Sequence, residues 1–266
     1  MQQCALCRRR AKLRESHLLP ASLYRIIRSD SGSTSLRHPV LVHNGKAVMT
    51  SIQFTCPLLC DNCEDLFSKK GERIVVAECH RPHESFLLRS KLETEKISFR
   101  DRKGAPWFSG SSLRSVDVEA YRYFAVSVFW RGSVGHWKPR EPLACRYSLG
   151  ERYEEDFRLY LLEEATLPKQ ALLIVFVDSG EEPLALISSP ESCNKGGYYL
   201  HHFRIPGIGF SLYLGRHIEH SLRYLADQFG TNIFFVLTDF RADPSFKEIL
   251  QVIKGAELKG KLALGA

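Results

Sequence analysis

The chain has 266 residues, is 44% apolar and carries a formal net charge of +7. This composition supports a buried core and excludes general disorder. No run of about 18 uncharged apolar residues occurs, which excludes a membrane-spanning helix. The N-terminus also lacks the apolar stretch of a signal peptide, so we expect a cytoplasmic protein whose cysteines stay reduced.

The first elements alternate between short strands and helices. Residues 17–28 predict the end of a strand and then a helix that opens at Pro20. Residues 39–56 predict a hairpin, because Asn44-Gly45 lies between apolar residues. Apolar spacing over 60–76 predicts a helix that begins inside the second cysteine pair.

The second half predicts a linker, helices and strands. Polar residues over 97–115 indicate a linker, and 117–131 predicts a helix that Asp117 can cap. Further helices are expected over 151–165, 216–229 and 244–254, and strands over 171–177, 185–187, 198–205, 210–214 and 232–238. The fold class is therefore α+β: a zinc-stabilised module over 1–95, then a helical middle and a mixed β-sheet over 96–266.

Two Cys-x-x-Cys pairs, Cys4/Cys7 and Cys60/Cys63, predict one structural zinc site. Two intervening residues let a backbone turn offer two thiolates to the same tetrahedral ion. The 52 residues between the pairs must then loop out. Unrelated pairs or a redox motif are the alternatives, and a redox motif does not explain why the spacing occurs twice.

The remaining cysteines are weaker candidates. Cys56 is expected to be structural or idle, and Cys145 and Cys193 are expected to be plain core thiols. The segment Cys79-His80-Arg81-Pro82-His83 is a weaker, alternative second metal site, and a packed cysteine with surface histidines is the better interpretation of it.

A cluster of basic residues accompanies the cysteines. Over residues 1–28 the only acid is Glu15. Such an excess next to a metal site is expected of a surface that contacts the phosphates of DNA or RNA, whereas alone it is equally a solvated basic face. The candidate nucleic-acid-binding residues are Arg8, Arg9, Arg10, Lys12, Arg14 and Arg25.

The motifs over residues 4–72 resemble those of zinc-bearing HNH (His-Me finger, ββα-metal) endonucleases. The resemblance rests on the first cysteine pair, on Ser16-His17-Leu18-Leu19-Pro20 and on Leu59-Cys60-Asp61-Asn62-Cys63-Glu64. More closely, the chain is similar to uncharacterised bacterial HNH-like proteins with SHxxP and LLCxxCExxxSxxE motifs, here Ser16–Pro20 and Leu58–Glu72. The segment ending in Phe129-Trp130-Arg131 also looks like a helix of that group.

This resemblance implies a nuclease that hydrolyses phosphodiester bonds of DNA or RNA. His17 matches the general base, which removes a proton from the attacking water. A catalytic Mg²⁺ or Mn²⁺ is implied, with Glu64 and Glu72 as carboxylate candidates. The group implies a role in mobile elements or antiviral defence, with residues 96–266 positioning substrate or binding a protein partner.

Three departures from the HNH pattern support a second hypothesis. Ser16 replaces the metal-binding aspartate, Glu64 replaces the histidine after the second pair, and the expected asparagine is missing. His17 is alternatively a packed histidine, and Glu64 a carboxylate that favours a helix N-terminus. The second hypothesis is a non-catalytic, zinc-stabilised nucleic-acid-binding or adaptor protein.

Overall fold

The computed structural model describes residues 1–29, 40–43, 46–49, 53–138, 146–242, 251, 255 and 257–259. The predicted helix over 244–254 and the predicted turn at 44–45 lie largely outside these ranges. None of the helices within them is long and apolar enough to cross a bilayer.

The N-terminal unit joins an antiparallel strand pair to a helix. Strand β3 (Leu13–His17) pairs with β6 (Thr55–Cys60), with His17 opposite Thr55. Strands β1 (Gln2–Gln3) and β2 (Arg10–Ala11) form a second small pair beside them.

Helix α2 (Asp61–Phe67) follows β6 directly and is continuous with a π-helical stretch (Ser68–Glu72) and with α3 (Arg73–Glu78). The predicted helix over 60–76 is therefore confirmed. A π-helical turn contains one residue more than an α-helical turn, so it changes the direction in which the following side chains point around the helix axis. Gly71 lies in this stretch against the backbone of α5 (Val118–Val134), where an added Cβ would lie 2.9 Å from the Phe124 nitrogen.

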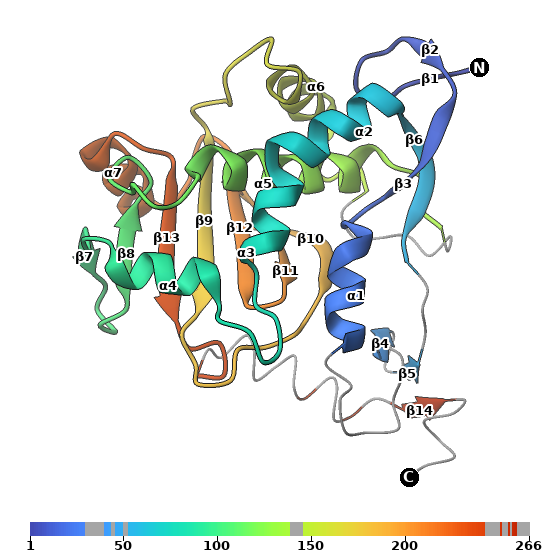
Figure 1. The fold of residues 1–266 in the computed structure, drawn as a ribbon. Helices are drawn as coiled ribbons and strands as arrows, with labels where there is room; N and C mark the ends of the chain where they lie inside the picture. The colour runs from blue at the N-terminus through green and yellow to red at the C-terminus, as the bar shows by residue number, and fades with distance from the viewer. Residues whose placement is uncertain are drawn as a thin grey trace.

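The insert between the two cysteine pairs contains α1 (Ala21–Ser29), as Pro20 predicts, and the hairpin of β4 (Val40–His43) and β5 (Lys46–Met49). The predicted hairpin is confirmed. Strand β14 (Glu257–Lys259) pairs in parallel with β5, so the end of the chain returns to the insert (Figure 1).

The main sheet has seven strands in the order β10-β11-β12-β9-β13-β8-β7. Only β9 and β13 pair in parallel, and the other neighbours are antiparallel. The strand bounds are β7 Phe99–Arg100, β8 Pro106–Ser109, β9 Ala171–Asp178, β10 Ser188–Asn194, β11 Tyr199–Ile205, β12 Ile208–Leu214 and β13 Ile233–Thr238.

Two predictions about this sheet are wrong. Residues 97–115 were predicted to be a linker, but β7 and β8 lie there and extend the sheet beyond β13. The signal is weak because only Phe108 and Ser109 of β8 are fully buried. The strand predicted over 185–187 is also displaced, since β10 begins at Ser188.

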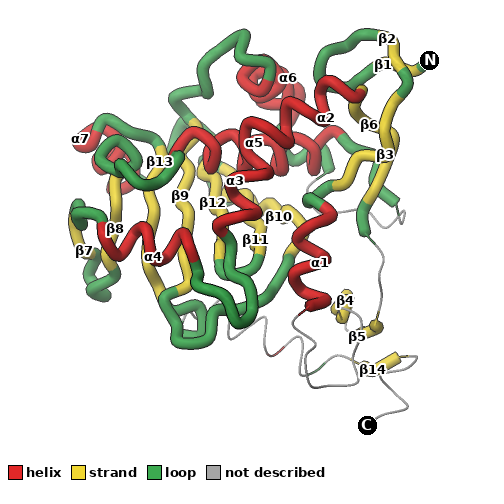
Figure 2. The backbone as a smooth tube through the Cα atoms, in the orientation of Figure 1, coloured by secondary structure: helices red, strands yellow, loops and turns green. Residues whose placement is uncertain are grey.

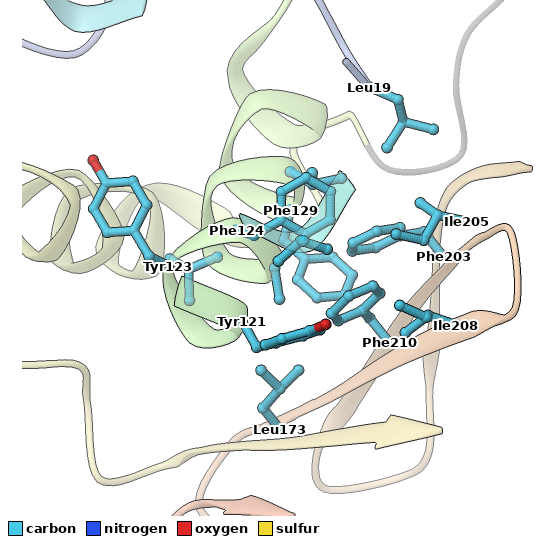
Figure 3. Packing of buried hydrophobic residues seen from close by; sticks show 14 of the residues in the cluster. Leu19, Tyr121, Tyr123, Phe124, Phe129, Leu173, Phe203, Ile205, Ile208 and Phe210 are labelled. Carbon is cyan, nitrogen blue, oxygen red and sulfur yellow. The ribbon is translucent and has the colours of Figure 1, made fainter. Parts of the chain in front are cut away.

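Helix α5 (Val118–Val134) packs its aromatic residues against one face of the sheet. Phe124 and Phe129 face Phe203 and Phe210 (Figure 3), and the last two rings stack with centroids 4.7 Å apart. These rings are buried, so they pack the core and do not stack bases. Asp117 caps α5 by accepting a hydrogen bond of 3.0 Å from the Ala120 amide, as predicted.

The other helices cover both faces. Helix α4 (Leu87–Thr94) shares the α5 face, and α6 (Gly150–Leu161) packs beside α5 (Figure 2). Helix α7 (His220–Phe229) covers the opposite face over β9 and β13. The buried cluster that contains α5 includes residues from both sides of position 95, and the division into 1–95 and 96–266 stays a prediction.

Candidate metal centre and the adjoining His17 site

The four cysteines of the two pairs meet at one point. Their Sγ atoms all lie within 4.8 Å of one another, and those of Cys7 and Cys60 are 3.8 Å apart. Four thiolates about 2.3 Å from a central Zn²⁺ lie about 3.8 Å from each other in a tetrahedron. Cys4, Cys7, Cys60 and Cys63 therefore form a cluster that fits a structural zinc ion.

The cluster is mostly buried, and its thiols interact. A hydrogen bond from Cys63, with help from backbone amides, lowers the pKa of Cys4 to about 4, although burial opposes the shift. Burial raises the pKa of Cys7. Zinc binding displaces the remaining thiol protons, so metal affinity and proton release are linked.

Backbone hydrogen bonds shape the first cysteine turn. The Arg8 amide donates to the Cys4 carbonyl at 2.9 Å, and Arg8 adopts a left-handed φ of 58°. The Ala5 amide donates to the Leu58 carbonyl at 3.0 Å, which ties this turn to β6. The two pairs are thus held together by main-chain contacts as well as by the cluster.

Helix α6 supports the same turn from the other side. Arg158 donates a 2.9 Å hydrogen bond to the Leu6 carbonyl and forms an ion pair with Glu155. Glu155 also pairs with Arg8. The first cysteine turn is therefore anchored on α6, about 150 positions later in the chain.

Glu64, at the start of α2, contacts the end of β3, where its carboxylate accepts a hydrogen bond from the Ser16 hydroxyl next to His17. Burial raises the pKa of the Glu64 carboxyl, and a hydrogen bond from the Ser16 hydroxyl and the charges of Arg131 and His17 oppose that shift. The Glu72 charge adds to the increase. The resemblance places metal ligands at positions 16 and 64, and here these two side chains bond to each other.

Glu72 faces Arg131 of α5. Their Oε1 and Nη1 atoms are 2.9 Å apart, as an ion pair without linear hydrogen-bond geometry. The Arg131 side chain is only 2% exposed. It also donates a 3.0 Å hydrogen bond to the His17 carbonyl and lies over the Phe67 ring at 5.3 Å. Arg131 therefore fixes the end of β3 and holds Glu72 in charge contact.

The described residues do not assemble a cage for Mg²⁺ or Mn²⁺. Within the described ranges, the cysteine cluster is the one group of three or more metal-ligating side chains close enough for a single ion. Glu64 is hydrogen bonded to Ser16, and Glu72 is paired with Arg131. The side chains of His43 and Asn44 lie outside the part of the chain that the structure describes.

The six predicted nucleic-acid-binding residues divide into two groups. Arg8 pairs with Glu155, and Arg14 pairs with Asp61 at 2.9 Å. The other four are exposed and form no ion pair with any residue that the structure describes. They are Arg9, Arg10, Lys12 and Arg25.

The weaker cysteine candidates stay outside the cluster. Cys56 is buried, and burial raises its pKa to about 11. Cys79 is also buried, and its thiol donates to the Val76 carbonyl at 3.2 Å. Cys145 lies outside the described residues. These contacts suit packed thiols.

Comparisons with protein-family models, with curated proteins and with solved structures found no match. The likeness to HNH endonucleases therefore rests on the sequence motifs alone. Sequence reasoning did not single out Arg131 for this site. The sequence did contain a signal for it: Arg131 follows an apolar helical stretch, and a buried arginine normally has a specific partner.

Proposed function

We propose that the chain is a zinc-stabilised nucleic-acid-binding protein. The observation that carries this proposal is the cysteine cluster, which joins the first cysteine turn to β6 and α2. Beside it lie exposed arginines that form no ion pair within the described ranges. Arg9 and Arg10 lie directly after the first cysteine turn, so the cluster sets their position. Exposed guanidinium groups on a rigid support suit contacts with phosphate oxygens.

Binding is tested by fluorescence anisotropy with labelled duplex and single-stranded DNA across a range of salt concentrations. Each phosphate contact contributes about 0.9 to the slope of log K against log salt for duplex DNA. Arg10→Met is expected to lower this slope by about one, whereas Lys103→Met, in an exposed turn of the main sheet, is expected to leave it unchanged. No measurable DNA or RNA binding at low salt would overturn the proposal.

A second candidate function is hydrolysis of phosphodiester bonds. The observation that favours it is the contact between Glu64, at the start of α2, and Ser16, which precedes His17 at the end of β3. The His17 imidazole would accept the proton of the attacking water, and Arg131 would keep β3 in place through its bond to the His17 carbonyl. HNH endonucleases would also require a divalent ion, but the described residues do not form a cage for one.

The two candidate functions predict different results in a DNA cleavage assay. The nuclease should nick plasmid DNA with Mg²⁺ or Mn²⁺, and His17→Ala should abolish nicking while zinc content stays the same. If the protein is a non-catalytic binder, neither the wild type nor His17→Ala nicks the plasmid, and both contain the same amount of zinc. Equal cleavage by wild type and His17→Ala would refute the role of His17. A role in antiviral defence stays a prediction from the resemblance.

A further inference from the structure

A group of exposed basic and aromatic side chains follows the buried end of α5 and is separate from the arginines that follow the first cysteine pair. It belongs to the segment after α5 and to the residues before α6. The group consists of His136, Lys138, Arg146 and Tyr147, all of which are exposed.

Strand pairing relates one member of this group, Lys138, to His17. Lys138 bridges to Thr55, with hydrogen bonds of 2.9 and 3.3 Å between their main chains, and Thr55 is paired on its other side with His17. Adjacent strands lie about 4.8 Å apart, so the Cα atoms of Lys138 and His17 are about 10 Å apart. Directly paired residues project to the same face of a sheet. The acid on this side, Glu15, accepts a hydrogen bond from Thr55.

The segment is anchored from within the core. Trp137 is buried, and its indole nitrogen donates to the Arg131 carbonyl at 3.1 Å. The Tyr147 amide donates to the Ser133 carbonyl at 3.0 Å. Arg131 therefore fixes both the end of β3 and the start of this exposed segment.

Tyr147 is displayed in an uncommon conformation. The residue is 63% exposed, and its φ is +57°, which is costly for a bulky side chain. Arg146 lies over the ring at 4.7 Å and bonds to His136 at 2.7 Å. An exposed ring held by an arginine suits stacking of an unpaired base, and the neighbouring cations suit its phosphates.

We propose that His136, Lys138, Arg146 and Tyr147 form a binding surface for single-stranded DNA, on which a base stacks on Tyr147 while the strand runs past His17. This inference rests on the proposed nucleic-acid binding and adds the strandedness of the ligand. The cations and the ring are complementary to one class of ligand, a phosphate backbone with unstacked bases.

The test compares Tyr147→Ala with Tyr224→Ala, because Tyr224 on α7 is exposed to a similar extent, 60%. Binding of a labelled single-stranded oligodeoxynucleotide is expected to weaken about tenfold in the first variant and to stay unchanged in the second. Tyr147→Asn, which tolerates a left-handed φ, should weaken binding equally and excludes a backbone effect. Lys138→Met should lower the salt slope by about 0.7, unlike Lys103→Met.

Three outcomes overturn the inference. If the wild type binds nucleic acid but the Tyr147 and Tyr224 variants bind equally, the surface is wrong and the proposed function stands. If the wild type binds only RNA, the assignment to DNA is wrong. If the wild type binds neither, the proposed function and this inference fail together.

Discussion

Arg131→Met is expected to destabilise the protein strongly, because it removes one partner of a buried ion pair. Arg131 and Glu72 are 2% and 17% exposed. The change also deletes the 3.0 Å hydrogen bond to the His17 carbonyl, while methionine keeps most of the apolar stem. Breaking such a pair from one side costs about 3–5 kcal/mol, since the remaining charge stays buried.

The assay is urea denaturation of zinc-loaded protein, followed by circular dichroism and tryptophan fluorescence. The matched control on the same helix is Arg122→Met, whose partner Glu119 is 70% exposed, so the expected loss is below about 1 kcal/mol. The double variant Arg131→Met with Glu72→Met should lose about 2 kcal/mol less than the sum of the single variants. Strict additivity, or a loss for Arg131→Met no greater than the control, would refute the ion-pair reasoning.

Further predictions concern zinc, pH and packing. Native mass spectrometry is expected to find one zinc ion per wild-type chain and none in Cys63→Ser, which should also lower the free energy of unfolding by about 3 kcal/mol or more. Cys193→Ser should keep the metal, and retention of zinc by Cys63→Ser would contradict the site. Burial lowers the pKa of His201 from 6.5 to about 4, so between these values only the unfolded chain takes up the proton. Stability should therefore fall by about 3 kcal/mol as pH drops from 6.5 to 4, and His201→Leu should flatten this dependence; an unchanged slope would refute the assignment. Gly71→Ala should cost about 1–3 kcal/mol in the same urea assay, because its Cβ would meet the α5 backbone at 2.9 Å, and an unchanged midpoint would show that α5 can move away.

Local signals in the sequence predicted the zinc cluster and most elements. The Cys-x-x-Cys spacing depends only on one turn of backbone, so Cys4 and Cys7 were identifiable without knowledge of the fold. Periodicity and a capping aspartate similarly placed α5. The hairpin of β4 and β5 followed from an Asn-Gly pair.

The rest depends on partners that are distant in sequence. Strand β8 joins the sheet only because β13, more than 100 residues later, supplies its hydrogen bonds. The role of Arg131 likewise depends on Glu72 and on the end of β3. Tyr147 was not predicted either, since its exposure and left-handed backbone are properties of the folded chain.

The parallel pairing of β14 with β5 has a consequence for synthesis of the protein. Glu257 lies opposite Lys46, so a ribosome must release more than 200 further residues before β5 can meet this neighbour. The insert around β5 then spends most of translation with an open strand edge, which is the kind of surface that pairs with other chains. Fusion of a bulky tag after Lys259 would disturb β14, which pairs with β5 in the N-terminal part of the chain.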